Sequence, residues 1–427
     1  MYGYCIVSKH FRFNMADLIW SFGGNFLAVV CNTGAKVLDV RDGTCKFSYA
    51  VDCIRQSALP EDASTLGHGV LCCFSKSGGL FALCTPYKEL FIWQTSDWKL
   101  LNKREVIRRS TVILFTNKED SIIVSNKGGD VYRFSVHDVD KEKDLLLGHV
   151  SMVLDMVLTE DDKFLITSDR DEKIRVSCFP NSYSIHTFCL GHLDFVSCLA
   201  LLSRSQNILV SGGGDGTVTF WNPDSGKDIA SKKIDYSIED IKEENPEDDQ
   251  HCGPIVSSLT CCCRNSVVCA IIERCKIISL YHASQKEVIT LPSLEANVPP
   301  WSAVFDPEGR LWCVQPYPEE PVLVFEPSGH SPDLTYVKLV SDFTPLLSSV
   351  SDWNYLKGSL NQERKLDTLR KKEVDNLTEY LARKEERIEK KNNKSKHQDN
   401  GHTKMDSSTV EPTTESEAKR PKLELTS

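Results

Sequence analysis

Short apolar runs separated by polar turns follow one another along the first 345 residues of the chain. Residues 26–30, 90–93 and 208–210 are examples, and each run is only a few residues long. Apolar runs of this length, bounded by Gly, Asn and Asp, are typical of β-strands, whereas a helix needs about ten residues or more. The pattern therefore predicts an all-β fold for this part of the chain.

The strongest signal is an internal repeat. Gly148-His149 and Gly191-His192 each begin a unit, and the two histidines are 43 residues apart. Each unit continues with an apolar run, a turn that contains Asp, and a second apolar run, which ends at Trp221 in the later unit. A period of about 40–45 residues with these landmarks is typical of WD repeats, each of which forms one four-stranded blade of a β-propeller.

Weaker units of the same kind precede and follow these two, and we count seven. The clearest are residues 69–95, 110–136, 148–179 and 191–223. The prediction is a seven-bladed WD40 β-propeller over residues 1–345, although six or eight blades also agree with the pattern at the ends. The alternating residues 2–8 are expected to supply the outer strand of the last blade, and the polar insertions 48–68 and 234–254 are expected to be loops.

WD repeats contain a buried tetrad in which a His, a Ser or Thr, an Asp and a Trp are hydrogen-bonded. By resemblance, this tetrad is formed in one unit by His192, Ser211, Asp215 and Trp221. In the preceding unit, His149, Thr167 and Asp171 match, but Ser177 stands in place of Trp. We expect a structural role for all of them, because a buried tetrad holds strands together and leaves no room for a substrate.

The strand pattern ends near residue 345. Leu366, Leu369, Val374, Leu377 and Leu381 then approximate one apolar stripe of a helix, which predicts a C-terminal α-helical extension over residues 346–392. Residues 393–427 are polar without periodicity and are expected to form a disordered tail. The tail contains the basic cluster Lys419-Arg420-Pro421-Lys422, which agrees either with a nuclear import signal or with a merely solvated tail. We expect a nuclear protein, and a cytoplasmic fraction is compatible with this.

The charge is unevenly distributed. The chain has 50 Lys and Arg against 60 Asp and Glu, a net charge of −10, which argues against a protein that coats nucleic acid by bulk electrostatics. Residues 360–427 hold 16 basic and 14 acidic residues, so the remaining 34 and 46 make residues 1–359 strongly acidic. The 17 cysteines lack zinc-knuckle spacing, and we interpret them as reduced, buried thiols that fill strands.

Catalytic motifs are missing from the sequence. It contains no G-x-x-x-x-G-K-[ST], H-E-x-x-H, G-x-S-x-G or G-x-G-x-x-G, so the simplest interpretation is a non-catalytic interaction platform. One candidate surface is the charged turn at residues 169–175, which either forms salt bridges within its blade or docks a partner. The other is a basic patch that is either a solvated face or a phosphate contact, formed by Lys103, Arg104, Arg108 and Arg109.

The sequence resembles the WD-repeat, non-catalytic subunit of the tRNA guanine-N7 methyltransferase. The segments that carry the resemblance are residues 74–78, 129–132, 147–152, 189–192 and 380–387 and, above all, Ser168-Asp169-Arg170-Asp171-Glu172-Lys173-Ile174-Arg175-Val176-Ser177. The last segment is specific, because a generic WD repeat does not produce this charged run together with a missing Trp.

The resemblance implies a division of labour. A separate catalytic subunit binds S-adenosylmethionine and methylates the variable loop of tRNA, and the propeller, without a cofactor or metal of its own, holds that subunit in an active heterodimer. By position, the residues that meet the catalytic subunit are Arg170, Asp171, Glu172, Lys173 and Arg175. Because residues of a strand alternate between its two faces, Arg175 is alternatively a support behind the interface. The implied candidates for tRNA contact are Lys103, Arg104, Arg108, Arg109, Arg383, Lys384, Arg387, Lys390 and Lys391.

The alternative is a generic WD scaffold, for example a substrate receptor of a ubiquitin ligase. Such receptors often carry Trp-Asp-x-Arg at the end of a repeat. Here Gln94 follows Trp93 and Asn222 follows Trp221, so the motif is missing from both repeats.

Overall fold

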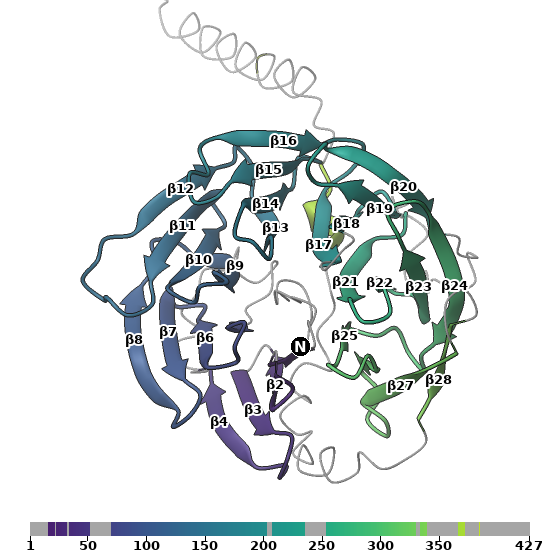
Figure 1. Ribbon diagram of the computed structural model, residues 1–427, viewed down its shortest axis with the longest axis horizontal. Helices are drawn as coiled ribbons and strands as arrows, with labels where there is room; N and C mark the ends of the chain where they lie inside the picture. Colours follow the sequence, from purple (N-terminus) through teal and green to yellow (C-terminus); the bar gives the residue numbers. More distant parts are fainter. Residues whose placement is uncertain are drawn as a thin grey trace, which may run out of the picture. The chain divides into compact units, whose positions relative to one another are not determined.

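A computed structural model describes residues 16–21, 23–31, 34–51, 70–202, 207–234, 253–329, 334–339, 366–371 and 384. These residues form seven four-stranded antiparallel sheets arranged as the blades of a ring (Figure 1). The prediction of an all-β, seven-bladed propeller is confirmed. The predicted helical extension and tail lie outside the described residues, apart from residues 366–371 and 384.

Each blade consists of four consecutive strands. Blade 1 comprises β1 (Ala16–Trp20), β2 (Phe26–Cys31), β3 (Gly34–Asp39) and β4 (Cys45–Ala50). Blade 2 comprises β5 (Leu71–Phe74), β6 (Leu80–Cys84), β7 (Glu89–Gln94) and β8 (Lys99–Glu105). Blade 3 comprises β9 (Ser110–Phe115), β10 (Ser121–Asn126), β11 (Asp130–Ser135) and β12 (Asp144–Gly148). Blade 4 comprises β13 (Val153–Leu158), β14 (Phe164–Asp169), β15 (Ile174–Cys178) and β16 (Ile185–Cys189).

The later blades repeat this order. Blade 5 comprises β17 (Val196–Leu202), β18 (Ile208–Gly213), β19 (Thr217–Asn222) and β20 (Lys227–Lys233). Blade 6 comprises β21 (Val256–Cys262), β22 (Val267–Ile272), β23 (Ile277–Ala283) and β24 (Val288–Glu295). Blade 7 comprises β25 (Ser302–Phe305), β26 (Leu311–Val314), β27 (Val322–Ser328) and β28 (Thr335–Lys338).

In every blade, the turn between the second and third strands lies on the same side of the ring as the connections between blades. Because the strands alternate in direction, the turn between a blade's second and third strands lies at the same end as the connections to the neighbouring blades. Backbone hydrogen bonds join these turns to the connections, as in Val106 N–H to Lys88 O (2.8 Å) and Arg170 N–H to Met152 O (3.1 Å). We call this side the inter-blade face, and it carries the candidate site.

The outer strand of blade 7 differs from the prediction. It is β28, whereas the expected closing strand, residues 2–8, lies outside the described residues. The strand that follows β27 directly in the chain takes this place, because closing a short connection costs less entropy than recruiting a distant segment. In the described residues, blades 1 and 7 meet through side chains alone, with Trp20 edge-on to Trp312 at 5.3 Å between ring centroids.

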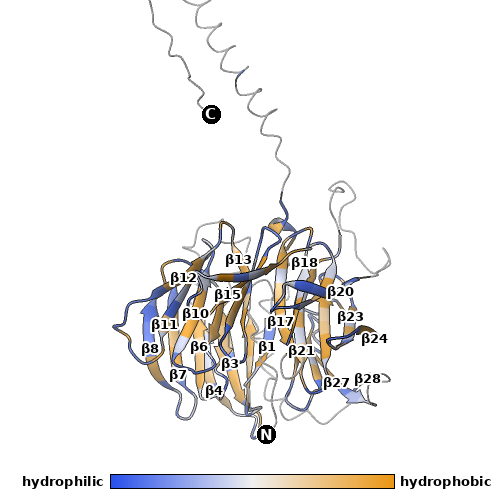
Figure 2. Ribbon diagram, turned by 45° about the horizontal axis from the view of Figure 1, so that its top comes forward, coloured by the Kyte–Doolittle hydropathy of each residue, from blue (hydrophilic) through white to orange (hydrophobic). Residues whose placement is uncertain are grey.

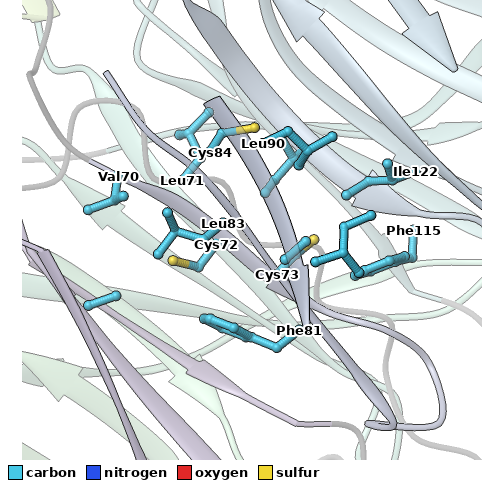
Figure 3. Close-up of a cluster of buried hydrophobic side chains, with 14 of the residues drawn as sticks. Val70, Leu71, Cys72, Cys73, Phe81, Leu83, Cys84, Leu90, Phe115 and Ile122 are labelled. Carbon is cyan, nitrogen blue, oxygen red and sulfur yellow. The ribbon is translucent and has the colours of Figure 1, made fainter. Parts of the chain in front are cut away.

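Apolar side chains of neighbouring blades pack together in clusters. Figure 2 shows that the outer strands β8 and β20 are hydrophilic, and most of their residues are exposed or half-buried. Figure 3 shows one cluster, in which Cys72, Cys73 and Cys84 pack with Phe81 and Ile122. All 14 described cysteines are free, and burial raises the pKa of Cys84 to about 12. Cys84 is therefore protonated and packs as a small apolar group, whereas Cys45 is exposed, which departs from the expectation that all the thiols are buried.

The compact unit that contains the propeller runs from Met1 to Arg370, and a second unit runs from Lys371 to Ser427. The short 3-10 helix η3 (Leu366–Leu369) thus belongs to the propeller unit. No helix among the described residues is long and apolar enough to cross a membrane.

Candidate partner-binding surface on blade 4

The tetrad of blade 5 links its strands through one histidine. The imidazole of His192 is hydrogen-bonded to Asp215 Oδ2 (2.9 Å) and to Ser211 Oγ (2.7 Å), and Trp221 Nε1–H donates to Ser211 Oγ (2.7 Å). Burial alone would raise the pKa of Asp215, but hydrogen bonds, first among them that from His192, keep it below its usual value. The four residues are buried or nearly so, which fits a structural role.

Blade 4 forms the equivalent contact with a different aspartate. His149 is hydrogen-bonded to Thr167 Oγ1 (2.8 Å) and to Asp169 Oδ2 (3.0 Å), so the assignment of Asp171 to this position was wrong. Asp169 also accepts the backbone N–H groups of Asp171 (2.9 Å) and Lys173 (3.0 Å). One buried carboxylate thus holds both the histidine and the turn, which leaves the side chain of Asp171 outside the tetrad.

Arg175 contacts the serine that stands in place of the Trp in blade 4. Its Nε–H donates to Ser177 Oγ (2.9 Å), and its Nη2–H donates to the carbonyl oxygen of Ser182 (2.8 Å). Ser177 is fully buried, and burial lowers the pKa of Arg175. Arg175 therefore supports the blade from within, through hydrogen bonds rather than through a salt bridge.

The remaining charged residues of the turn differ in what they face. Arg170 is directed at the chain's own C-terminal segment, with Nε–H donating to Leu369 O (2.7 Å) and Nη2–H donating to Arg370 O (3.1 Å). Asp171 and Glu172 are half-buried, and Glu172 adopts a left-handed backbone conformation (φ 71°). Lys173 is exposed and forms no ion pair with the described residues. Of the predicted set, Lys173 is the best placed to meet another molecule.

Exposed apolar side chains lie in the connections on both sides of blade 4. Eight of the eleven exposed large apolar residues in the described part of the chain lie between Val139 and Leu193. Val150 is fully exposed, Leu190 is 64% exposed and Leu193 is 85% exposed, and all three lie in the connections at the two sides of blade 4. Ile174 pairs with Cys189, so the next pair in this register brings Lys173 beside Leu190.

We call Val150, Lys173, Leu190 and Leu193 the blade-4 surface. Sequence reasoning missed its apolar members, because they flank the Gly-His pairs, which attract attention to the histidines. An apolar residue on each side of Gly191-His192, in a connection that should be polar, was the available signal.

The predicted basic patch divides into structural and exposed residues. Arg104 Nη2–H donates to the carbonyl oxygens of Ser135 (3.0 Å) and Asp138 (2.9 Å), and Lys103 pairs with Glu89 (3.3 Å). Burial lowers the pKa of Arg109. Arg104 and Arg109 therefore serve the packing of blades 2 and 3, and of the four only Arg108 is exposed without an ion pair to the described residues.

Two further lysines accompany Arg108 on the inter-blade face. The carbonyl oxygen of Lys88 accepts a hydrogen bond from the backbone N–H of Val106, and the backbone N–H of Lys127 donates to the carbonyl oxygen of Arg109 (3.0 Å). Lys88 and Lys127 are exposed, and with Arg108 they form what we call the basic strip. Lys384 is exposed as well, while Arg383, Arg387, Lys390 and Lys391 lie outside the described residues. Within the described ranges, no group of His, Cys, Asp and Glu is arranged to hold a metal ion.

Comparisons with known proteins identify the relatives of the chain. Residues 135–301 match the family model of the tRNA methyltransferase TRM82 WD40 domain. The chain is 33% identical over 375 residues to the mouse tRNA (guanine-N(7)-)-methyltransferase non-catalytic subunit WDR4, covering 85% of this chain and 87% of that protein. It is 32% identical to the human protein of the same name, over 73% of this chain and 74% of that protein.

A relative from Culex quinquefasciatus, the non-catalytic subunit wuho, is 41% identical over 36% of this chain and 39% of its own length. Among solved structures, a chain of the mitotic checkpoint complex superimposes with a TM-score of 0.56 and 16% identity, covering 76% of this chain and 86% of that chain. At this identity the structural likeness concerns the fold alone.

Proposed function

Because the chain belongs to the family of WD40 non-catalytic subunits of tRNA (guanine-N7)-methyltransferases, we propose that it binds the catalytic subunit through the blade-4 surface and stabilises it in an active heterodimer. The chain is the non-catalytic subunit, which implies a separate catalytic partner. S-adenosylmethionine is then bound by that partner, and this chain contributes binding and orientation.

The observation that carries the proposal is that the two connections flanking blade 4 expose apolar side chains on the same face of the ring as the turn with the exposed Lys173. Leu190, Leu193 and Val150 expose apolar surface that a monomer has reason to bury, and such surface marks a protein interface. Lys173 adds a charge that orients the partner and suppresses wrong contacts. Asp171 and Glu172 lie half-buried in the same turn as Lys173, whereas the side chains of Arg170 and Arg175 are hydrogen-bonded to other parts of this chain.

We propose that tRNA is held mainly by charge, along the basic strip and the basic residues that follow residue 383. Lys88, Arg108 and Lys127 are exposed in consecutive turns and connections of blades 2 and 3, on the same face as the blade-4 surface. Contacts between such residues and phosphates fix the position of an RNA without reading its sequence. A helical C-terminal extension and nuclear import through residues 419–422 complete the proposal.

The experiment is reconstitution from separately purified subunits. We expect 7-methylguanosine to form in tRNA at a high rate only when both chains are present, and not with this chain alone. The variant Leu190→Asp/Leu193→Asp should lose copurification with the catalytic subunit, whereas Leu100→Asp, which alters an exposed leucine of blade 2, should not. Product formed by this chain alone would overturn the proposal, and so would normal assembly of the double variant. Binding to a cullin adaptor in place of the methyltransferase would favour the ubiquitin-ligase alternative.

A further inference from the structure

Residues 366–370 are folded back onto the inter-blade face of the propeller, where they touch blades 4, 5 and 6 (Figure 1, yellow-green). We call these residues the clasp. They follow blade 7 in the chain, yet the blades that they contact lie on a different part of the ring. Such a contact between distant parts of one chain calls for a physical explanation.

Apolar contacts anchor the clasp. Leu366 and Leu369 are fully buried in one cluster with Leu154, Phe195 and Ile255, which lie near the starts of the innermost strands of blades 4, 5 and 6. Removing two leucine side chains from water favours the docked position of the clasp. The predicted apolar stripe thus begins with two residues that belong to the propeller core.

Polar contacts fix the orientation of the clasp. Arg170 donates to the last two carbonyl groups of the clasp, those of Leu369 and Arg370. The guanidinium of Arg370 pairs in return with Asp194 (2.5 Å) and donates to Gly253 O (3.0 Å). Asp367 pairs with Arg274 (3.1 Å), so blades 4, 5 and 6 each hold one point of the segment.

We propose that Arg170 is a positioning residue: it closes the clasp and thereby fixes the point at which the basic C-terminal part of the chain leaves the propeller, beside the blade-4 surface. Two nitrogens of its guanidinium group are already bound to the clasp, so it does not serve as a contact to the partner. Arg383 follows Arg370 by 13 residues, a length of chain that spans at most about 45 Å. The clasp thus limits how far from the bound partner the basic residues act on RNA, and this consequence rests on the function proposed above.

Hydrogen exchange of this chain without any partner tests the clasp itself. Arg170→Leu should accelerate exchange of the amides of residues 366–370 at least about tenfold, since a hydrogen bond from a charged donor contributes roughly tenfold or more to closure. Arg133→Leu is the matched control, because it removes an arginine that pairs with Asp144 at the rim of blade 3. Unchanged exchange in Arg170→Leu, or equal acceleration in the control, would overturn the proposal.

Binding by the assembled heterodimer tests the consequence. Arg170→Leu should weaken tRNA binding at least about threefold in the full chain and leave affinity for the catalytic subunit within twofold. A chain that ends after Lys371 retains the clasp but lacks the basic residues that the clasp is proposed to position. In this shortened chain, Arg170→Leu should have no effect on tRNA binding. An equal loss in both backgrounds, or a loss of partner affinity with the clasp still protected, would identify Arg170 as a direct contact. If the unaltered heterodimer bound no tRNA, the proposed function would be wrong. The hydrogen-exchange experiment would still test whether Arg170 closes the clasp.

Discussion

Asp169 rather than Asp171 organises the turn of blade 4, and this difference has consequences for stability. Asp169→Asn should lower the free energy of unfolding by about 2 kcal/mol, because it weakens hydrogen bonds from His149 and from two backbone N–H groups. Asp171→Asn should cost less than about 0.5 kcal/mol. Denaturant titration of both variants measures the difference, and a larger loss in Asp171→Asn would contradict the assignment.

The same carboxylate predicts a pH dependence. Burial would raise the pKa of Asp169, but the hydrogen bond from His149 and those from the turn outweigh it, so the pKa lies below its usual value. A lowered pKa in the folded state stabilises the fold above about pH 4 and ceases to do so as the pH falls through the folded value. The stability gap between the natural chain and Asp169→Asn should therefore narrow below pH 4, and a gap that widens there would exclude this origin.

Lys173 is the residue on which the proposed partner contact depends most. Lys173→Glu should weaken binding to the catalytic subunit by about 1–3 kcal/mol, because it places a repelling charge at the interface. Lys163→Glu is the control, since Lys163 is an exposed lysine in the turn at the opposite end of the same blade. Calorimetry with both variants measures the effect, and equal affinities would remove Lys173 from the interface.

The position of the charged turn could be predicted from the sequence, but the separate roles of its charged residues could not. Arg170 and Arg175 have the same charge as Lys173, yet they donate to carbonyl and hydroxyl groups of this chain, one of which lies 199 residues away. Such partners depend on the path of the whole chain, and no local pattern predicts them. The exposure of Leu190 and Leu193 likewise follows from the path of the connection between blades 4 and 5.

At the scale of elements, the residues of the basic strip come from two turns and one connection that are separated in the sequence. Lys88→Gln/Arg108→Gln/Lys127→Gln should weaken tRNA binding by the heterodimer and reduce the dependence of log K on log salt by about one for each phosphate that the variant no longer neutralises. The control alters three exposed lysines on the outer strands β4, β8 and β20, namely Lys46, Lys99 and Lys227. If both triple variants lowered the slope equally, the strip would have no special role.

The strands themselves were largely predictable, because short apolar runs between turns leave the backbone few alternatives. Trp93 and Trp221 marked the third strands of blades 2 and 5. The outer strand of blade 7 was not predictable in this way, since β28 is only four residues long and its burial is slight. The packing of Leu366 and Leu369 against the propeller could not be predicted from the sequence, because their spacing also fits the apolar stripe of a helix.

At the scale of the whole molecule, the ring is joined between blades 1 and 7 by side chains alone in the described residues. Trp312 is fully buried there, contacts Trp20 and donates through Nε1–H to Asp306 (2.9 Å). Trp312→Ala should lower the free energy of unfolding by about 3–5 kcal/mol. Hydrogen exchange should also accelerate first in β1 and β25, whereas Trp221→Ala should affect β18 and β19 first. Acceleration spread evenly over all blades would show that this junction is no weaker than the others.

The acidic propeller with a few exposed basic residues suits a subunit whose partner handles the reacting nucleotide. The central claim is that this chain activates the catalytic subunit through blade 4. The most direct measurement is titration of the chain into a fixed amount of catalytic subunit, with 7-methylguanosine formation in tRNA as the readout. The natural chain should raise activity to a plateau, and Lys173→Glu should reach the same plateau only at concentrations about fivefold to a hundredfold higher, as 1–3 kcal/mol implies. Superimposable curves for the two chains, or activity of the catalytic subunit that does not rise with either chain, would contradict the account.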